Sequence, residues 1–156
     1  MSRKIIAATA ALAAGFAAVL ALGAAPASAE TTQEKANIKT VEAFYDAAIN
    51  AKDFAKAKTF LGDRYTQHNP NAKDGPDGLN GYIDFLRAKF PAQHSTFEQA
   101  FADGAFVILH VHRIQVPGTA GSAIVDIFKL EKGKVVEHWD VIQDIPDKAA
   151  NTNGMF

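Results

Sequence analysis

The sequence of 156 residues contains no cysteine, which excludes disulfide bonds, thiol nucleophiles and cysteine-ligated metal centres. It also has no surplus of basic residues, because 16 Lys and Arg stand against 17 Asp and Glu. Domains that bind nucleic acid carry a basic patch or stripe, so this balance argues against a nucleic-acid partner. Beyond residue 29 there is no apolar run of the roughly 20 residues that a membrane-spanning helix needs.

The first 29 residues have the three-part pattern of a secretory signal peptide. Two basic residues precede an almost entirely apolar run over residues 5–22, and Ala27-Ser28-Ala29 offers small residues at a cleavage site. The alternative is a membrane anchor, because the run is about long enough to span a bilayer. The glycine, proline and cleavage site directly after the run favour removal. We expect cleavage between Ala29 and Glu30 and an exported protein, periplasmic or extracellular, with no membrane contact after cleavage.

The remaining residues 30–156 have a length typical of one domain, and 11 Phe, three Tyr and one Trp supply its core. Residues 30–35 are polar, and we expect them to be loosely structured. Apolar positions recur at helical spacing over residues 38–50, 53–62 and 79–90, and an extended arm or short strand is expected over residues 65–70. Alternating patterns predict strands over residues 96–102, 105–116, 122–130 and 135–143. This order predicts an α+β domain in which three helices cover a four-stranded antiparallel meander.

Ionisable side chains stand in the middle of otherwise apolar strand faces. Because side chains alternate along a strand, His110 and His112 share one face, Asp126 lies mid-strand on the next, and His138 and Asp140 share a face on the last. A buried ionisable group is costly unless it is paired. We therefore expect these faces to converge on one polar-lined pocket.

The opposite faces are also largely apolar, and they carry Val125, Ile127, Trp139 and Val141. One interpretation is that these residues form the core and that the His and Asp faces are solvated. The other is that they form an exposed apolar patch, which is uncommon on a monomer and which a second copy would cover in a homodimer. We favour the pocket and the homodimer.

Four segments together carry a resemblance to a known family. They are Tyr65-Thr-Gln-His68-Asn69-Pro70, His110-Val-His112-Arg113, the run from Val125 to Gln143 that contains His138-Trp139-Asp140, and Asn153-Gly-Met-Phe156. In these segments the chain resembles the SnoaL-like proteins of the nuclear transport factor two-like superfamily. The resemblance implies a curved sheet that helices wrap into a cone, and usually a dimer.

The resemblance also implies roles for individual residues. SnoaL-type polyketide cyclases carry out an intramolecular aldol condensation without a cofactor, and a His-x-Asp pair on their last strand supplies the acid/base carboxylate. The matching residues are His138 and Asp140, and Asp126 occupies the region of an assisting polar residue that can be His in the cyclases. His68 and Asn69 occupy the arm that closes the pocket, where they would contact a substrate.

Chemistry at a carbon next to a carbonyl needs a carboxylate base in an apolar pocket and a donor for the developing enolate oxygen. Asp140 with His138 and Asp126 offers both, and His110 and His112 are further substrate-binding candidates. We therefore predict a cofactor-independent acid/base enzyme of the aldol cyclase, isomerase or hydratase type that acts on a small apolar carbonyl compound.

Three other interpretations stay open. The protein can be an exported small-ligand-binding protein without turnover, or the polar residues can form a buried network that only satisfies itself. The third is a metal site, because His110, His112 and His138 with an aspartate are acceptable zinc ligands. We expect that no metal is required.

Overall fold

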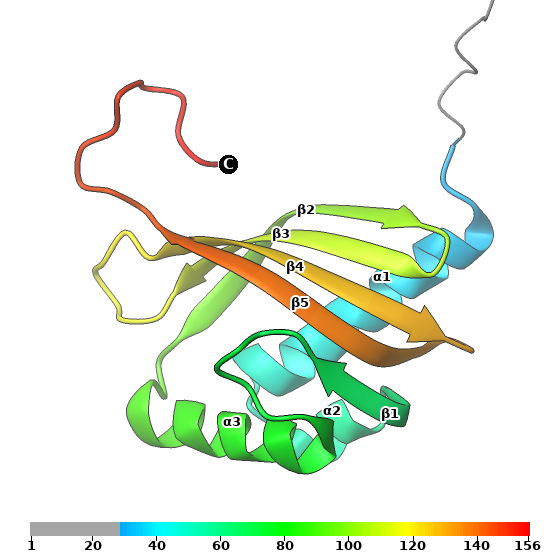
Figure 1. The fold of residues 1–156 in the computed structure, drawn as a ribbon. Helices are drawn as coiled ribbons and strands as arrows, with labels where there is room; N and C mark the ends of the chain where they lie inside the picture. The colour runs from blue at the N-terminus through cyan, green and yellow to red at the C-terminus, as the bar shows by residue number, and fades with distance from the viewer. Residues whose placement is uncertain (1–28) are drawn as a thin grey trace, which may run out of the picture.

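The computed structural model describes residues 29–156, so nearly all of the expected signal peptide lies outside the described range. The elements are α1 (Thr32–Tyr45), a π-helical turn η1 (Asp46–Asn50), α2 (Phe54–Lys58), β1 (Leu61–Gln67), α3 (Gly75–Lys89), β2 (His94–Asp103), β3 (Phe106–Ile114), β4 (Ser122–Glu131) and β5 (Lys134–Asp144) (Figure 1). The strands form one five-stranded sheet in the order β1-β5-β4-β3-β2. The predicted α+β class is confirmed. Within residues 29–156, no helix is long and apolar enough to cross a membrane.

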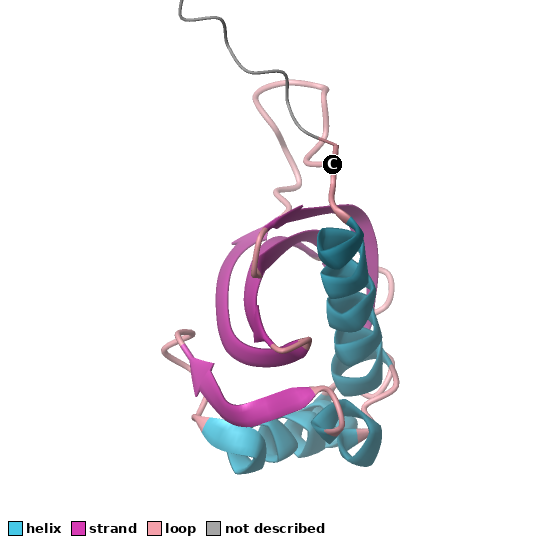
Figure 2. Cartoon of the chain, turned by 90° about the vertical axis from the view of Figure 1, so that its right-hand side faces the viewer, coloured by secondary structure: helices cyan, strands magenta, loops and turns pink. Residues whose placement is uncertain are grey.

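The sheet is strongly curved, and the helices pack on its inner side (Figure 2). Phe44 of α1 contacts Tyr65 of β1 and Phe128 of β4 in edge-to-face geometry, with ring centroids 6.0 and 5.9 Å apart. Val107 and Leu109 of β3 are fully buried beneath them. The core therefore lies inside the curve of the sheet, and the polar pocket described below opens from it.

The first helix begins earlier than expected. Thr31 and Glu34 form a capping box, in which the Thr31 hydroxyl accepts from the Glu34 N–H at 3.1 Å and Glu34 Oε2 accepts from the Thr31 N–H at 2.7 Å. This Thr-x-x-Glu pattern satisfies two N–H groups that a helix start otherwise leaves unpaired. The expectation of a loose segment over residues 30–35 is therefore wrong, because the helix begins at Thr32.

The second helix is shorter than predicted, and the sheet gains a strand. The helix ends at Lys58, and Leu61 begins β1, which pairs in parallel with β5 through Leu61 and Val135. Gly62 permits this close pairing, because a Cβ there would lie 2.7 Å from Cγ1 of Val136. The four-stranded meander is correct for β2 to β5, but the sheet has a fifth, parallel strand at its edge.

The outer side of the β1–β5 pair carries a cluster of charged residues. Glu137 Oε1 accepts from Lys129 Nζ and from Arg64, both at 2.9 Å, and Arg64 also contacts Glu131 at 2.7 Å. The hydrogen bonds from Lys129 and Arg64 lower the pKa of Glu137 to about 2. The carboxylate therefore contributes stability that is present above its unfolded pKa of about 4.3 and is lost as the pH falls through about 2.

We accordingly expect Glu137→Gln to lower the melting temperature at pH 7 by about 1–4 °C, the range for a small network of exposed ion pairs. The difference from the unmodified protein should shrink as the pH falls from 4 towards 2. Thermal unfolding followed by circular dichroism across this range measures it. Glu98→Gln, at an exposed position of β2, is the matched control and should show no such pH dependence. A Glu137→Gln difference that stays constant down to pH 2 would contradict the assignment.

Candidate active site

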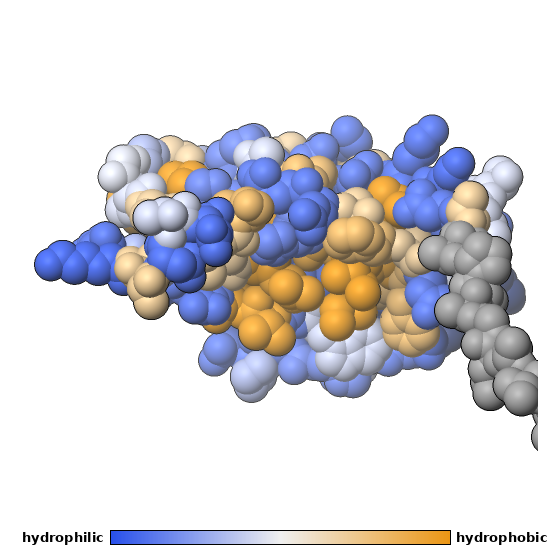
Figure 3. Space-filling model, turned by 90° about the horizontal axis from the view of Figure 1, so that it is seen from above, coloured by the Kyte–Doolittle hydropathy of each residue, from blue (hydrophilic) through white to orange (hydrophobic). Residues whose placement is uncertain are grey.

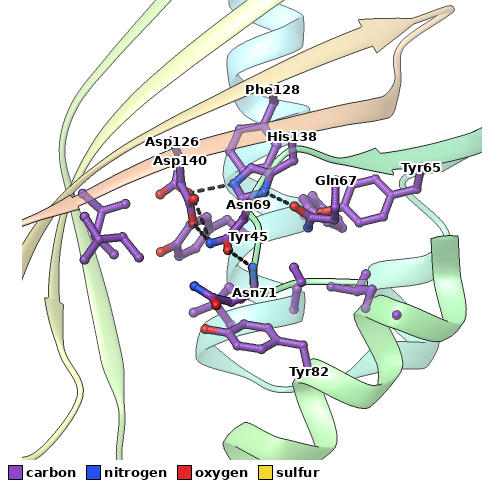
Figure 4. Close-up of a pocket in the computed structure, with 18 of the residues that line it drawn as sticks. Tyr45, Tyr65, Gln67, Asn69, Asn71, Tyr82, Asp126, Phe128, His138 and Asp140 are labelled. Carbon is purple, nitrogen blue, oxygen red and sulfur yellow. Dashed lines mark hydrogen bonds and ion pairs between the residues drawn. The ribbon is translucent and has the colours of Figure 1, made fainter. Parts of the chain in front are cut away.

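A cavity of about 110 Å³ opens between the inner face of the sheet and the helices (Figure 4). Its polar lining includes Asn69, Tyr82, Arg113, Asp126, His138 and Asp140. The volume is similar to the roughly 150 Å³ of a protein cavity that holds benzene. The site therefore suits a small molecule.

One chain of hydrogen bonds crosses the floor of the pocket. His138 Nε2 lies 2.9 Å from Asp126 Oδ1, and His138 Nδ1 lies 2.9 Å from Gln67 Oε1. The Gln67 amide nitrogen donates to the Tyr65 hydroxyl at 2.9 Å, so the amide oxygen faces the imidazole. His138 Nδ1 must then carry a proton, and a second proton is shared between Nε2 and Asp126. Both ring nitrogens of His138 therefore have hydrogen-bond partners within the protein.

Asp126 is 4% exposed, and its second oxygen, Oδ2, has no hydrogen-bond partner within the described residues. Burial raises the pKa of Asp126, the hydrogen bond from His138 lowers it, and the nearby charge of Asp140 raises it further, with a net rise. Desolvation disfavours the charged carboxylate more than one neighbouring imidazole restores it. Asp126 is thus a carboxyl group disposed to hold a proton.

Asp140 lies beside Asp126 in a different environment. The two residues are direct partners across β4 and β5. The side-chain nitrogen of Asn69 donates to both oxygens of Asp140 at 2.8 Å, and Asn69 Oδ1 accepts from the Asn71 N–H at 2.8 Å. Asn69 therefore orients the half-buried Asp140 carboxylate beside the buried Asp126 carboxyl group.

Tyrosine hydroxyl groups complete the polar lining. Burial, as the largest cause, raises the pKa of Tyr45 and of Tyr65 above its usual value, and the charge of Asp126 raises both further. Both side chains therefore keep their protons. The Tyr45 hydroxyl donates to the Ser95 hydroxyl at 3.5 Å, whereas the Tyr65 hydroxyl accepts from Gln67 and keeps its own proton for a ligand oxygen. Sequence patterns did not indicate these tyrosines, because at their spacing in a helix or strand they resemble ordinary core residues.

The structure does not bring His110 and His112 into the pocket. His110 is the partner of Val125 across β3 and β4, whereas the residue opposite Asp126 is Leu109. The two histidines therefore lie on the outer face, where their rings contact Phe156 at centroid distances of 5.2 and 4.7 Å. The expectation that they share a pocket face with Asp126 is wrong by one residue of register, which reverses every side chain of a strand.

His68 also points away from the pocket. Its ring stacks on Trp139 at a centroid distance of 4.2 Å, and its Nε2 lies 3.3 Å from Glu137 on the outer face. Neighbouring residues of an extended segment point in opposite directions. The arm therefore presents Asn69 to the pocket and His68 to the outside, so the expected substrate contact by His68 is not supported.

The predicted alternative of a His110, His112 and His138 metal site fails for the same reason, because these histidines lie on opposite faces of the sheet. The donors that do converge are those of Asp126, His138 and Asp140, within 4.8 Å of one another. Nitrogen and carboxylate ligands of this kind suit several divalent ions. A metal there would take His138 Nε2 from its hydrogen bond with Asp126, so we keep the expectation that no metal is required.

Comparisons with known proteins agree with this architecture. Residues 41–138 match the family model of the SnoaL-like domain. A candidate SnoaL-like polyketide cyclase from Jannaschia Sp. CCS1 superimposes with a TM-score of 0.61 at 19% identity, over 74% of this chain and 91% of that one.

Two further solved structures are similar. They are TsrD from Streptomyces laurentii (TM-score 0.58, 19% identity, 69% of this chain and 88% of that one) and a cystatin-fold protein from Novosphingobium aromaticivorans (TM-score 0.57, 22% identity, 67% and 97%). At these identities the structures support the fold alone, and no curated protein matches the chain. The family model covers more than half of the chain, so the protein belongs to the SnoaL-like family.

Proposed function

We propose that the protein is a cofactor-independent acid/base enzyme, of the isomerase, hydratase or aldol cyclase type, that acts on a small carbonyl compound in this pocket. The observation that carries the proposal is the pair of adjacent carboxyl groups in unlike environments. Asp126 is buried and has a raised pKa, whereas Asp140 is half-buried and held by Asn69. Two neighbouring carboxyl groups whose environments differ in this way divide the roles of acid and base.

The chemistry follows from the positions of these groups. Asp140 accepts the proton from the carbon next to the carbonyl, and the electrons of the broken C–H bond form the enolate, whose negative charge develops on the carbonyl oxygen. The hydroxyl group of Tyr65, which accepts from Gln67 and keeps its own proton, is the donor suited to that oxygen. The proton held by Asp126 and His138 is available to a second oxygen, either a leaving hydroxyl or the alkoxide formed in an aldol step. Return of the first proton to another carbon completes an isomerisation.

Membership of the SnoaL-like family supports this proposal, and so does the similarity to a candidate polyketide cyclase. The aliphatic part of the lining, Ile124 and Ile142 among others, suits the apolar portion of a small substrate. The cavity itself is small, so a substrate with several fused rings would require the pocket to widen.

Exchange of hydrogen for deuterium tests the proposal without knowledge of the natural substrate. Small ketones and keto acids are incubated with the protein in D₂O containing EDTA, and loss of the proton signal next to the carbonyl is followed by NMR. We expect exchange well above that in buffer for at least one compound. Compounds that bind without exchanging would instead favour a ligand-binding protein, an alternative consistent with the polar groups already being bonded to one another. If exchange occurs in the absence of EDTA and disappears in its presence, the reaction requires a metal.

Export is part of the proposal as well. The pattern of residues 1–29 supports removal of this segment and release of a protein that begins at Glu30. The intact mass of the protein secreted from its host decides this, and a membrane-bound form that retains the segment would contradict it.

The outer face of the sheet supports a homodimer. Phe106, Val125 and Val141 are 41%, 39% and 70% exposed, and the partly buried Ile127 and Trp139 lie between them on the same face. Apolar side chains gather on the molecule between polar margins in the view from above (Figure 3). A patch of this kind usually pairs with itself about a two-fold axis.

We therefore expect a dimer in light scattering at micromolar concentration. Val141→Glu should shift the protein to monomers, because each interface would bury two unpaired charges. Glu98→Gln again serves as the control and should remain dimeric. A wild-type monomer would contradict the assignment of this face.

A further inference from the structure

Arg113 is a cation at one end of the pocket without a carboxylate partner. It lies on β3 between Ser95 and Ser122 of the neighbouring strands. Its Nη2 makes a long contact of 3.4 Å to the Ser122 hydroxyl, and its side chain also bonds to Tyr82 of α3. Its Nε is buried without a partner, and none of the ion pairs within residues 29–156 involves it. A guanidinium group keeps its charge under all ordinary conditions. Within residues 29–156 this half-buried cation therefore has no directly paired carboxylate, and the nearest link to one runs through the Ser122 hydroxyl to Asp144.

Gln93 supplies a second unsatisfied group to the same pocket. The residue is 3% exposed, lines the cavity, and has no partner for either Nε2 or Oε1 within the described residues. Its main chain is held firmly, because its N–H donates to the Phe90 carbonyl at 3.0 Å and its carbonyl accepts from the buried Lys52 ammonium at 3.0 Å. A buried side-chain amide without partners is rare in folded proteins, and a ligand group that reaches the Gln93 amide would supply the missing partner.

Within the described residues, Arg113 and Gln93 make no hydrogen bond to the carboxyl pair, although the charge of Arg113 acts to lower the pKa of Asp126. Along β3, Arg113 is four residues beyond Leu109, which is the partner of Asp126. At about 3.3 Å per residue the main-chain separation is roughly 13 Å, part of which the long arginine side chain spans. Ile124 and Ile142 line the cavity between the two ends. The charge of Arg113 also opposes the rise in the pKa of Tyr82 that burial causes, so Arg113 acts on the α3 side of the pocket as well.

We propose that Arg113 and Gln93 bind a carboxylate group of the substrate, so that the substrate is a small keto acid with its carbonyl at Asp140. The arginine donates charged hydrogen bonds to the carboxylate, the Gln93 amide adds a neutral one, and the isoleucines contact the carbon chain. Repulsion from the Asp140 carboxylate disfavours the reverse orientation. The identity of the reacting carbonyl rests on the proposed function, whereas the anion site rests on Arg113 and Gln93 alone.

A matched pair of probes, 4-oxopentanoate and its methyl ester, tests the anion site by calorimetric titration at pH 7. We expect the acid to bind at least 10-fold more tightly than the ester, the preference typical of a charged hydrogen bond. Arg113→Met should remove this preference, and Gln93→Leu should weaken acid binding by a smaller factor of about 3–10. Arg113→Lys, which keeps the charge, should retain part of the preference and guards against a fold defect, with circular dichroism and melting temperature as checks.

Lys73, the other cation that lines the pocket, provides the control. Lys73→Met removes the same charge, and the preference for the acid should remain. Equal binding of acid and ester by the wild type, no binding of either at millimolar concentration, or a loss caused by Lys73→Met rather than by Arg113→Met would overturn the proposal. If only the proposed acid/base function is wrong, the preference for the acid still depends on Arg113, but no proton exchange occurs. The two failures are therefore distinguishable.

Discussion

Asp140→Asn is expected to lower the rate of proton exchange, and of turnover for any substrate found, by about 10²–10⁴-fold, the usual contribution of a positioned acid/base group. The amide keeps the shape of the side chain, and its oxygen still accepts from Asn69, but it cannot take a proton from carbon. Ligand affinity and melting temperature should change far less than the rate. Exchange kinetics, titration and thermal unfolding of the same preparation separate the three effects.

Asp63→Asn, an exposed aspartate of β1, is the control and should leave the rate unchanged. Asn69→Ala is informative in addition, because Asn69 orients Asp140 without exchanging a proton itself. It should lower the maximal rate while Asp140 remains able to act, so its loss should be smaller than that of Asp140→Asn. An Asp140→Asn protein that melts early yet exchanges protons at the full rate would remove Asp140 from the mechanism and leave Asp126 as the candidate base.

Removal of the imidazole by His138→Ala should destabilise the fold by about 3–5 kcal/mol at neutral pH, the cost of removing one partner of a buried pair. Asp126 is 4% exposed, and within the described residues its only hydrogen-bond partner is His138. The Asp126 carboxyl group then retains its proton in the folded state more strongly than in the unfolded state. Stability should therefore fall as the pH rises from about 4, the unfolded pKa of an aspartate, towards 8.

The double variant Asp126→Asn/His138→Ala isolates this effect from the loss of the ring contact between His138 and Phe128, which have centroids 4.7 Å apart. A neutral amide has no charge to leave uncompensated, so the double variant should be more stable than His138→Ala at pH 8 and should lack its pH dependence. Urea unfolding at pH 4 and pH 8 measures both. A double variant no more stable than His138→Ala alone would show that packing, and not the buried carboxyl group, sets the cost.

The two carboxyl groups and the anion site assign different tasks to the two ends of one pocket. Asp126 and Asp140 lie against the floor formed by β4 and β5, whereas Arg113 and Gln93 come from the β2–β3 end. A substrate whose carboxylate binds at the Arg113 end has its carbonyl at the Asp140 end. Binding therefore also orients the reacting group. The proposed chemistry and the proposed substrate class thus depend on separate residues, and each can be tested without the other.

Local sequence determined most of the elements and part of the site. The Lys132-Gly133 turn has positive φ at both residues, 52° and 72°, and joins Glu131 directly to Lys134. A two-residue turn of this type sets the register of the pairs next to it. A bulge between Lys129 and Leu130 then shifts the pairing by one residue, so that Asp126 lies opposite Asp140 and the predicted shared face of Asp126, His138 and Asp140 is correct. The resemblance to SnoaL-like proteins, carried by the motifs around these residues, is confirmed by the family match.

Only the tertiary structure decided which faces of β1 and β3 line the pocket with Asp126, His138 and Asp140. The connection over residues 115–121 is too long for its sequence to set the register between β3 and β4, and the observed pairing of Leu109 with Asp126 turns His110 and His112 outward and Arg113 inward. The parallel pairing of β1 with β5 brings Gln67 to His138 across a long stretch of sequence. Periodicity reports which side chains of one strand share a face, but the register between distant strands depends on packing of the whole core, and in this protein that packing selected the residues of the pocket.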